Sequence, residues 1–464
     1  MGRKNASDRR ERRQARKEKE ARKQRKAEAK SKRKAKNAKE EDLDALIAQF
    51  MDMDKGVEKV TELPRKSVSA RAYASLVLSP TNDELILFGG EFTNGIKTFV
   101  YGELLFYNIK KDDWRNVQIP KGPPPRSGHQ AVSVSRLGGQ MWVFGGEYSS
   151  PTGSTFKHFN DLWCLNIKDK KWMKVTRSGA PSSRSGHRMV LFNKCLVVFG
   201  GFHDDAKHAP KYFNDVHLFD LENYRWDKLV FPQVKPAPDA RSACQMVATK
   251  DGVYVYGGYS KSRVRGEVYK GVTHTDMWRL EASEDAAAAE LYAQQLENKD
   301  LKKTAAQGAF GVGLKWEWTR VRPSGAAPSQ RSGAAAAVRA NGSMVSFGGV
   351  CDEETDDALK GQFFDDLYQL NTNTLSWSQL RVKRTEGSPC ARMSANICCK
   401  GNTLFMFGGI LEVGDKQITL NDLNSLDLNK LNEWKVLRGV DKRAQQWLEE
   451  SSSEEEDDDD DDDA

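Results

Sequence analysis

Met141-Trp-Val-Phe-Gly-Gly146 is a run of four apolar residues followed by two glycines, and this pattern occurs six times in the 464-residue chain. Short apolar runs bounded by turn residues are typical of strands buried on both faces. The glycine pairs are Gly89-Gly90, Gly145-Gly146, Gly200-Gly201, Gly257-Gly258, Gly348-Gly349 and Gly408-Gly409. Their first members are separated by 56, 55, 57, 91 and 60 residues. A period of about 50 residues is the length of one blade of a β-propeller.

Each glycine pair has companions at regular distances. An Arg-Ser-Gly motif or a relative opens an earlier strand, an acidic residue opens a later one, and a tryptophan begins the last. The acidic residues are Glu103, Asp161, Asp215, Asp276, Asp366 and Asp422, and the tryptophans are Trp114, Trp172, Trp226, Trp318, Trp377 and Trp434. The acidic residue precedes the tryptophan by 11 residues in four repeats and by 12 in the sixth. This pattern predicts an all-β fold, a six-bladed propeller of four-stranded antiparallel blades over residues 57–440.

The fourth repeat departs from the spacing, because Asp276 and Trp318 are 42 residues apart. We interpret residues 283–313 as an insertion between the third and fourth strands of that blade. Its alanine-rich composition predicts one helix, with Ser283 or Asp285 as the N-cap and Gly308 beyond the end.

The glycine pair, the acidic strand and the spaced tryptophan resemble the kelch repeat, over roughly residues 62 to 440. The flanks also resemble one eukaryotic branch of that family in having a basic N-terminal tail, a segment ending at Phe50, and an acidic tail after Gln446-Trp-Leu-Glu-Glu450. The resemblance implies a propeller that binds protein partners through its loops.

Some kelch propellers are enzymes, but the residues here do not match them. The copper oxidase type needs tyrosine, histidine and a cysteine cross-linked to a tyrosine, and the seven histidines of this chain supply no such set. The iron-dependent type uses Glu-xxx-Asp-xxx-His, whereas here Gly200 stands where the glutamate would precede Asp204 and His208. We therefore expect no catalytic residues, no metal and no cofactor.

The two ends of the chain carry opposite charge. Residues 1–40 hold 19 Lys and Arg against 6 Asp and Glu, and residues 449–464 hold 12 acidic residues and no basic one. We expect a basic low-complexity tail over 1–42, in which residues 1–40 bind RNA or an import receptor or act only as a solubilising tail. We expect an acidic tail over 441–464, in which Ser451, Ser452 and Ser453 fit an acidophilic kinase. Between the basic tail and the propeller, the apolar spacing predicts a short amphipathic helix over 43–55.

Candidate partner-binding residues fall into two groups. The loops after the glycine pairs carry contrasting charge, at Lys261, Arg263 and Arg265 in blade four and at Asp352, Glu353 and Glu354 in blade five. The repeated arginines, among them Arg126, Arg184, Arg241 and Arg331, form either a ring that binds an acidic peptide or, as we favour, ion pairs with the acidic residues of the repeat.

The composition and motifs favour a monomeric, non-enzymatic interaction scaffold located inside the cell, in the nucleus, the cytoplasm or both. The seven cysteines form no CxxC motif, and no apolar stretch is long enough for a membrane span. The alternative is a nuclear or nucleolar ribonucleoprotein assembly factor whose basic tail binds RNA. Blade six takes its outer strand either from Trp434-Lys-Val-Leu437 or from residues 57–63 ahead of blade one, and we favour the N-terminal stretch.

Overall fold

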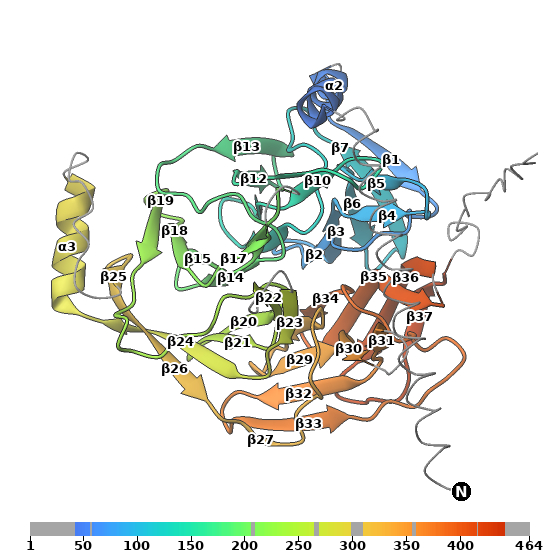
Figure 1. The fold of residues 1–464 in the computed structure, drawn as a ribbon. Helices are drawn as coiled ribbons and strands as arrows, with labels where there is room; N and C mark the ends of the chain where they lie inside the picture. Colours follow the sequence, from blue (N-terminus) through green and yellow to red (C-terminus); the bar gives the residue numbers. More distant parts are fainter. Residues whose placement is uncertain are drawn as a thin grey trace, which may run out of the picture.

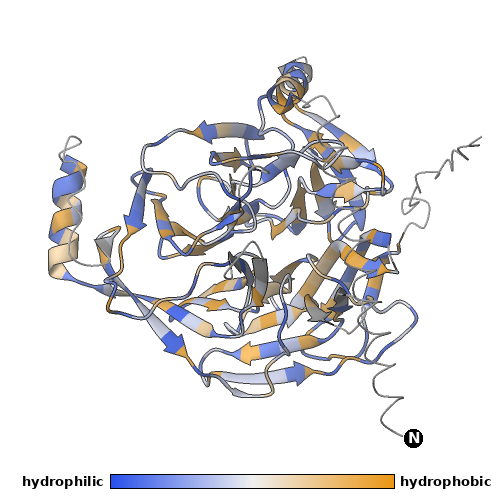
Figure 2. Ribbon diagram, in the orientation of Figure 1, coloured by the Kyte–Doolittle hydropathy of each residue, from blue (hydrophilic) through white to orange (hydrophobic). Residues whose placement is uncertain are grey.

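The computed structural model describes residues 42–55, 58–205, 209–263, 269–297, 310–354, 359–414 and 416–440. Six sheets surround a central axis, each built from one sequence repeat (Figure 1). Their blade strands are antiparallel, and only the two-residue strand β27 (Ser324–Gly325) adds to the edge of one described sheet in parallel. The predicted six-bladed propeller is therefore confirmed. Hydrophobic residues recur along the blade strands, and hydrophilic residues are frequent in the outermost strands (Figure 2).

The four strands of each blade follow one another in the chain from the axis outward. The bounds are β2 (Ser75–Leu78), β3 (Glu84–Phe88), β6 (Leu104–Asn108) and β7 (Asp113–Gln118) in blade one; β8 (Gln130–Val134), β9 (Gln140–Phe144), β12 (Leu162–Asn166) and β13 (Lys171–Val175) in blade two; β14 (Arg188–Phe192), β15 (Cys195–Phe199), β18 (Val216–Asp220) and β19 (Arg225–Leu229) in blade three; β20 (Gln245–Thr249), β21 (Gly252–Tyr256), β24 (Met277–Glu284) and β26 (Leu314–Val321) in blade four; β28 (Ala335–Val338), β29 (Met344–Phe347), β32 (Leu367–Asn371) and β33 (Ser376–Leu380) in blade five; and β34 (Asn396–Lys400), β35 (Thr403–Val413), β36 (Lys416–Asp427) and β37 (Lys435–Arg438) in blade six.

The segments after the glycine pairs form two-stranded ribbons. They are β4 (Glu91–Thr93) with β5 (Thr98–Val100), β10 (Glu147–Ser149) with β11 (Phe156–His158), β16 (Phe202–His203) with β17 (Lys211–Tyr212), β22 (Tyr259–Arg263) with β23 (Tyr269–Thr273), and β30 (Val350–Glu354) with β31 (Leu359–Phe363). In blade six the extended ends of β35 and β36 take this place. We call these six ribbons the hairpin face, since all lie at the same end of their blades.

The tryptophans join neighbouring blades. Each packs against the aromatic residue that precedes the glycine pair of the blade before it, with ring centroids 5.3–5.9 Å apart at all six seams. All six tryptophans are buried. The hydrophobic core accordingly divides into six clusters, each shared by two adjacent blades. Burial of such large aromatic surfaces between blades, rather than within one, stabilises the ring as a unit.

The glycine pairs allow this close approach. Gly89 has φ +65°, and a Cβ there would lie 2.5 Å from the carbonyl oxygen of Arg126 in the next blade. Gly90 donates its backbone N–H to the same oxygen over 2.9 Å. A side chain at Gly89 would therefore clash with backbone that is itself held in place, which explains why glycine is needed.

The prediction that the N-terminal stretch closes the ring is wrong. Strand β1 (Thr61–Arg65) pairs with β7 and adds a fifth strand to blade one, whereas β37 supplies the outer strand of blade six. The closing seam is held by side chains and by backbone bonds such as Arg71 N to Leu420 O, 3.1 Å. Because β7 presents a free edge to the segment that leads into blade one, the nearest pairing for that segment is local.

Two helices of the described residues lie outside the ring (Figure 1). Helix α2 (Leu43–Lys55) occupies the range expected from the sequence, and it packs on the propeller through buried Ile47 and an ion pair between Asp44 and Lys157. Helix α3 (Ala286–Glu297) lies in the insertion of blade four, and Asp285 caps it by accepting a bond from Ala288 N at 3.0 Å.

The insertion is shorter than its predicted bounds. Ser283 lies within β24, which pairs with β26 along its whole length, and β25 (Phe310–Gly311) adds a further strand. The hydroxyl of Tyr292 on α3 donates to Asp220, so the insertion contacts blade three. Gly308 lies outside the described residues.

Candidate functional site

The Arg-Ser-Gly motif forms a turn at the axis of the propeller. Its third residue has positive φ in every blade, including three that are not glycine: Tyr73 at 53°, Ala243 at 50° and Ser394 at 54°. At five of the six seams the N–H of this residue donates to the carbonyl of its equivalent in the preceding blade, over 2.8–3.3 Å. The turns thus form a nearly complete ring of backbone bonds around the channel.

The repeat arginines are buried within their own blades. Each makes an ion pair with the acidic residue of its own repeat, and donates to the carbonyl of the first glycine of the pair over 3.0–3.1 Å. The pairs are Arg71–Glu103, Arg126–Asp161, Arg184–Asp215, Arg241–Asp276, Arg331–Asp366 and Arg392–Asp422. These arginines are at most 5% exposed, so they are not available to an acidic peptide in this structure, and the internal pairing that the sequence favoured is observed.

The pKa values of the paired carboxyl groups reflect this arrangement. Burial would raise the pKa of Asp215, but hydrogen bonds from His217 and Arg184 outweigh it, and the pKa lies below its usual value. Burial would also raise the pKa of Asp161, but the charge and hydrogen bonds of Arg126 outweigh it, so the pKa of Asp161 is lowered as well. Both carboxyl groups are therefore ionised at neutral pH, as an internal ion pair requires.

A cavity of ≈ 530 Å³ occupies the axis just inside the turns, a size typical of small-molecule pockets. The first residue of every innermost strand lines it: Ser75, Gln130, Arg188, Gln245, Ala335 and Asn396. Each of these six lies opposite the aromatic residue before the glycine pair, so they stand at one level. We call this set the channel ring. Beyond it the wall is largely apolar, with several alanines from blade five.

Two carboxyl groups stand at the mouth of the cavity, where β4 and β10 begin. Burial raises the pKa of Glu91, and burial with the nearby charge of Glu91 raises the pKa of Glu147 to about 8. Ser127 donates to Glu91 over 2.7 Å. Neighbouring His158 has its pKa lowered to about 4 by burial and by His203. At pH 7 the mouth therefore holds less charge than its residue types indicate.

The mouth does not form a catalytic triad. His158 Nδ1 lies 2.8 Å from Ser185 Oγ and 3.3 Å from Glu147 Oε2, while its Nε2 accepts from Asp204 N at 3.0 Å. A triad needs serine and carboxylate on different ring nitrogens, so the imidazole cannot pass a proton between them. Within the described residues no three His, Cys, Asp or Glu side chains are grouped to hold a metal ion.

The predicted partner-binding residues on the loops lie on the hairpin face. Lys261 is exposed in β22, which also contains Arg263, while Asp352, Glu353 and Glu354 are in β30. Arg265, both tails and Ser451, Ser452 and Ser453 lie outside the described residues. The hairpins that carry the two groups belong to neighbouring blades four and five, so opposite charge is placed on adjacent ribbons of one face.

Sequence reasoning missed the channel ring and the mouth. Both could have been found in the sequence, because the ring residue always stands four positions after the repeat arginine and the mouth residue directly follows the glycine pair. These positions vary between repeats while their neighbours recur. Variation at one position of a regular repeat is the signal that would have identified them.

Among the described residues, neither helix has the length and apolar character needed to cross a membrane. The solved structure of YjhT is similar in fold, with a TM-score of 0.51 at 16% identity, covering 80% of this chain and 98% of that one.

Curated relatives match shorter parts of the chain. Human host cell factor 2 is 26% identical over 64% of this chain, the fission yeast (Schizosaccharomyces pombe) tip elongation aberrant protein 1 is 28% identical over 42%, and the Chlamydomonas reinhardtii flagellar outer-arm dynein alpha chain is 33% identical over 36%. The matches span only 32%, 16% and 3% of those proteins.

A family model, the KLHDC2/KLHL20/DRC7 kelch-repeats domain, matches residues 74–286 and 284–448. These residues include all six blades apart from the added strand β1. The chain therefore belongs to the kelch-repeat family.

Proposed function

We propose that this chain is a non-enzymatic scaffold that binds a protein partner through its hairpin face. The observation that carries the proposal is that these ribbons present exposed apolar side chains. Ile96 and Phe99 in blade one, Val272 in blade four and Val413 in blade six are 38–55% exposed. Apolar side chains presented together on one surface are typical of protein interfaces.

Charge on the same face supports specificity for one partner. The strand β22 of blade four carries the basic residues Lys261 and Arg263, and the strand β30 of the adjacent blade five carries Asp352, Glu353 and Glu354. A partner with the complementary arrangement would be favoured, and one with the reverse arrangement would be repelled.

The tails would add localisation and electrostatic capture. In this proposal residues 1–40 engage an import receptor, and phosphorylation of Ser451, Ser452 and Ser453 increases the charge of the acidic tail. The layout of the tails around the propeller resembles that of the eukaryotic kelch domain-containing protein 4, and we infer an intracellular role in the nucleus, the cytoplasm or both.

Proximity labelling from the full chain tests the hairpin face. Lys261→Glu with Arg263→Glu reverses two charges on it, and Lys168→Glu with Lys250→Glu reverses two exposed charges in turns at the other end of their blades. We expect the hairpin variant to lose a set of labelled proteins that the control keeps. Identical sets for both variants and the original chain would refute the proposal.

The RNA-binding alternative rests on the 19 basic residues in the first 40. It predicts RNA binding that weakens steeply with salt. A titration of single-stranded RNA with the full chain and with residues 41–464 distinguishes the scaffold proposal from the RNA-binding alternative. Equal and negligible RNA binding by the two proteins would exclude the alternative.

A further inference from the structure

Arg188 differs from the repeat arginines that surround it. Its Nε donates to the carbonyl of Cys244, and no carboxylate within the described part of the chain lies at ion-pair distance from it. Burial lowers the pKa of Arg188, and the neighbouring Cys244 thiol opposes that effect only in part. Each of the six repeat arginines forms an ion pair with a carboxylate. Arg188 differs from them because its charge is not paired in this way within the described residues.

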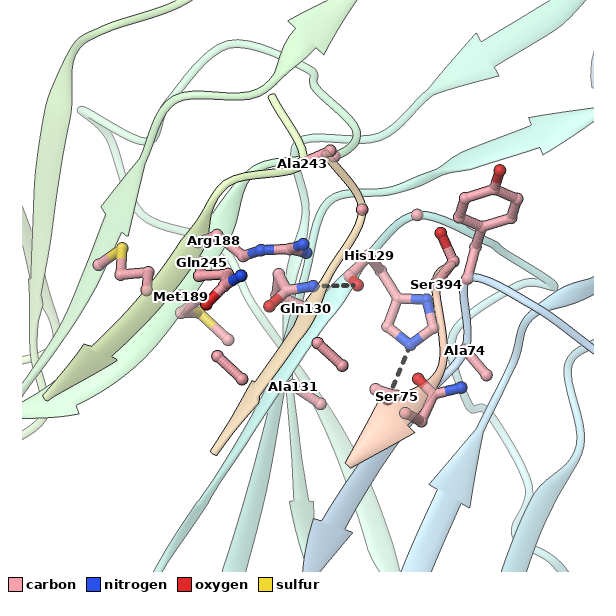
Figure 3. A pocket seen from close by; sticks show the side chains of 18 of the residues that line it. Ala74, Ser75, His129, Gln130, Ala131, Arg188, Met189, Ala243, Gln245 and Ser394 are labelled. Atoms are coloured by element: carbon pink, nitrogen blue, oxygen red, sulfur yellow. Dashed lines mark hydrogen bonds between the residues drawn. The ribbon is translucent and has the colours of Figure 1, made fainter. Parts of the chain in front are cut away.

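Two other side chains of the channel ring are also incompletely bonded, Gln245 in the adjacent blade four and Asn396 across the axis in blade six. Gln245 is 4% exposed and its Oε1 has no hydrogen-bond partner among the described residues; Asn396 is 9% exposed and its Nδ2 has none. Both line the same cavity as Arg188. Figure 3 shows Arg188, Gln130 and Gln245 extending into one part of it. Buried polar atoms are almost always bonded in folded proteins, so these mark a place where a polar ligand or water completes the set.

The channel ring therefore combines one uncompensated cation with donors and acceptors that face the same space. A guanidinium binds carboxylates and phosphates through two parallel hydrogen bonds. An amide oxygen such as that of Gln245 accepts from a hydroxyl or amide of the same ligand. The apolar wall beyond the ring would exclude water from one side of the bound molecule and so strengthen these bonds.

We propose that the channel ring binds a small polar molecule bearing an oxyanion, either a carboxylate or a phosphate, with Arg188 holding the anion and Gln245 and Asn396 bonding the neutral polar groups. The mouth permits entry of such an anion. Glu147, with its pKa at about 8, is mostly protonated at pH 7 and presents little negative charge. This site is separate from the hairpin face and does not depend on the partner proposed for it.

Calorimetric titration of the full chain tests the site with three probes: inorganic phosphate, D-glucuronate and uncharged D-glucose. We expect saturable one-to-one binding of at least one of the two anions and none of glucose. Which anion binds distinguishes a phosphate ligand from a carboxylate ligand. Absence of binding by both anions, up to millimolar concentrations, would overturn the proposal.

Arg188→Gln should weaken binding of the anion by about tenfold to hundredfold, as expected for loss of a charged hydrogen bond. Arg322→Gln is the matched control, since Arg322 is exposed and does not line the cavity, and it should leave binding unchanged. Equal binding by Arg188→Gln and the original chain would refute the assignment.

A second variant guards against misfolding. Gln245→Leu replaces the incompletely bonded amide by an apolar side chain of similar size, and we expect it to weaken anion binding severalfold while the unfolding temperature is kept or raised. Unaltered binding in a folded Gln245→Leu protein would remove Gln245 from the site, and unaltered binding in both variants would overturn the proposal altogether.

Discussion

Replacement of Arg184 by leucine tests the internal ion pairs of the repeat. Arg184 is fully buried, and its two terminal nitrogens donate to Asp215 over 2.6 and 3.1 Å. It also donates to Gly200 O over 3.0 Å and stacks on Phe213 at 4.2 Å. Leucine retains part of the packing and none of the bonds. Asp215 would keep its hydrogen bond with His217, at 3.0 Å.

The cost follows from the carboxylate that is left behind. Removal of one partner of a buried pair destabilises a protein by about 3–5 kcal/mol. The Asp215 side chain is 20% exposed, so we expect a loss near the lower end, about 3 kcal/mol. Adding Asp215→Asn to Arg184→Leu removes the orphaned charge, so the double variant should be more stable than the sum of the single effects by about 1 kcal/mol or more.

Urea unfolding followed by circular dichroism measures these differences. Arg188→Leu is the control, because Arg188 lies four residues away in the same blade and pairs with no carboxylate in the described part of the chain. We expect its free energy of unfolding to change by about 1 kcal/mol or less. If Arg184→Leu and Arg188→Leu cost the same, or if the double variant is strictly additive, the assigned role of the ion pair is incorrect.

Three further predictions concern the core, the mouth and the insertion. Trp172→Ala should cost about 3–5 kcal/mol, because it opens a cavity between blades one and two, whereas Phe99→Ala at the exposed hairpin should cost about 1 kcal/mol or less in the same urea assay. Glu147 has its pKa raised from 4.5 to about 8 in the folded protein, so the stability of the original chain falls as pH rises between these two values; Glu147→Gln should therefore gain stability relative to the original chain from about pH 4.5 to about pH 8, with no further gain above that, and a difference that stays constant across this range would contradict the prediction. Asp285→Ala should weaken α3 by about 1 kcal/mol, seen as faster amide exchange confined to Ala286–Glu297; unchanged exchange there would show that the cap does not hold the helix.

The fold could be predicted from the sequence because each blade is a local unit. The glycine pair, acidic residue and tryptophan all serve contacts within a blade or with the next one, and such contacts repeat with the chain. Even Trp318, displaced by the insertion, pairs opposite Leu280 as Trp172 pairs opposite Leu165.

The strand that closes the ring was harder to predict from the sequence, since it depends on which of two sheet edges a single strand pairs with. The residues of β1 fit either blade one or blade six by pattern alone. Their pairing with β7 is decided by proximity along the chain and by three-dimensional geometry.

The candidate sites were predicted only in part. The hairpin charges are visible in the sequence because they stand out in composition, whereas Arg188 has the same residue type as the paired arginines and looks ordinary. What distinguishes it is the absence of a carboxylate within reach in the described structure, and that depends on the packing of blades three and four.

The closing seam has a mechanical consequence. Among the strands that the structure describes, none crosses between blades six and one, and β1 and β37 belong to separate sheets. A force applied to the termini therefore loads the contacts between two complete blades, among them the packing of Trp114 on Phe407 and the bond from Arg438 to Asp112. The backbone bonds across this seam, such as the one from Arg71 N to Leu420 O, would break together with these contacts. The molecule would then open into an arc of six blades, so its first response to force would be a change of shape rather than the unfolding of a whole sheet.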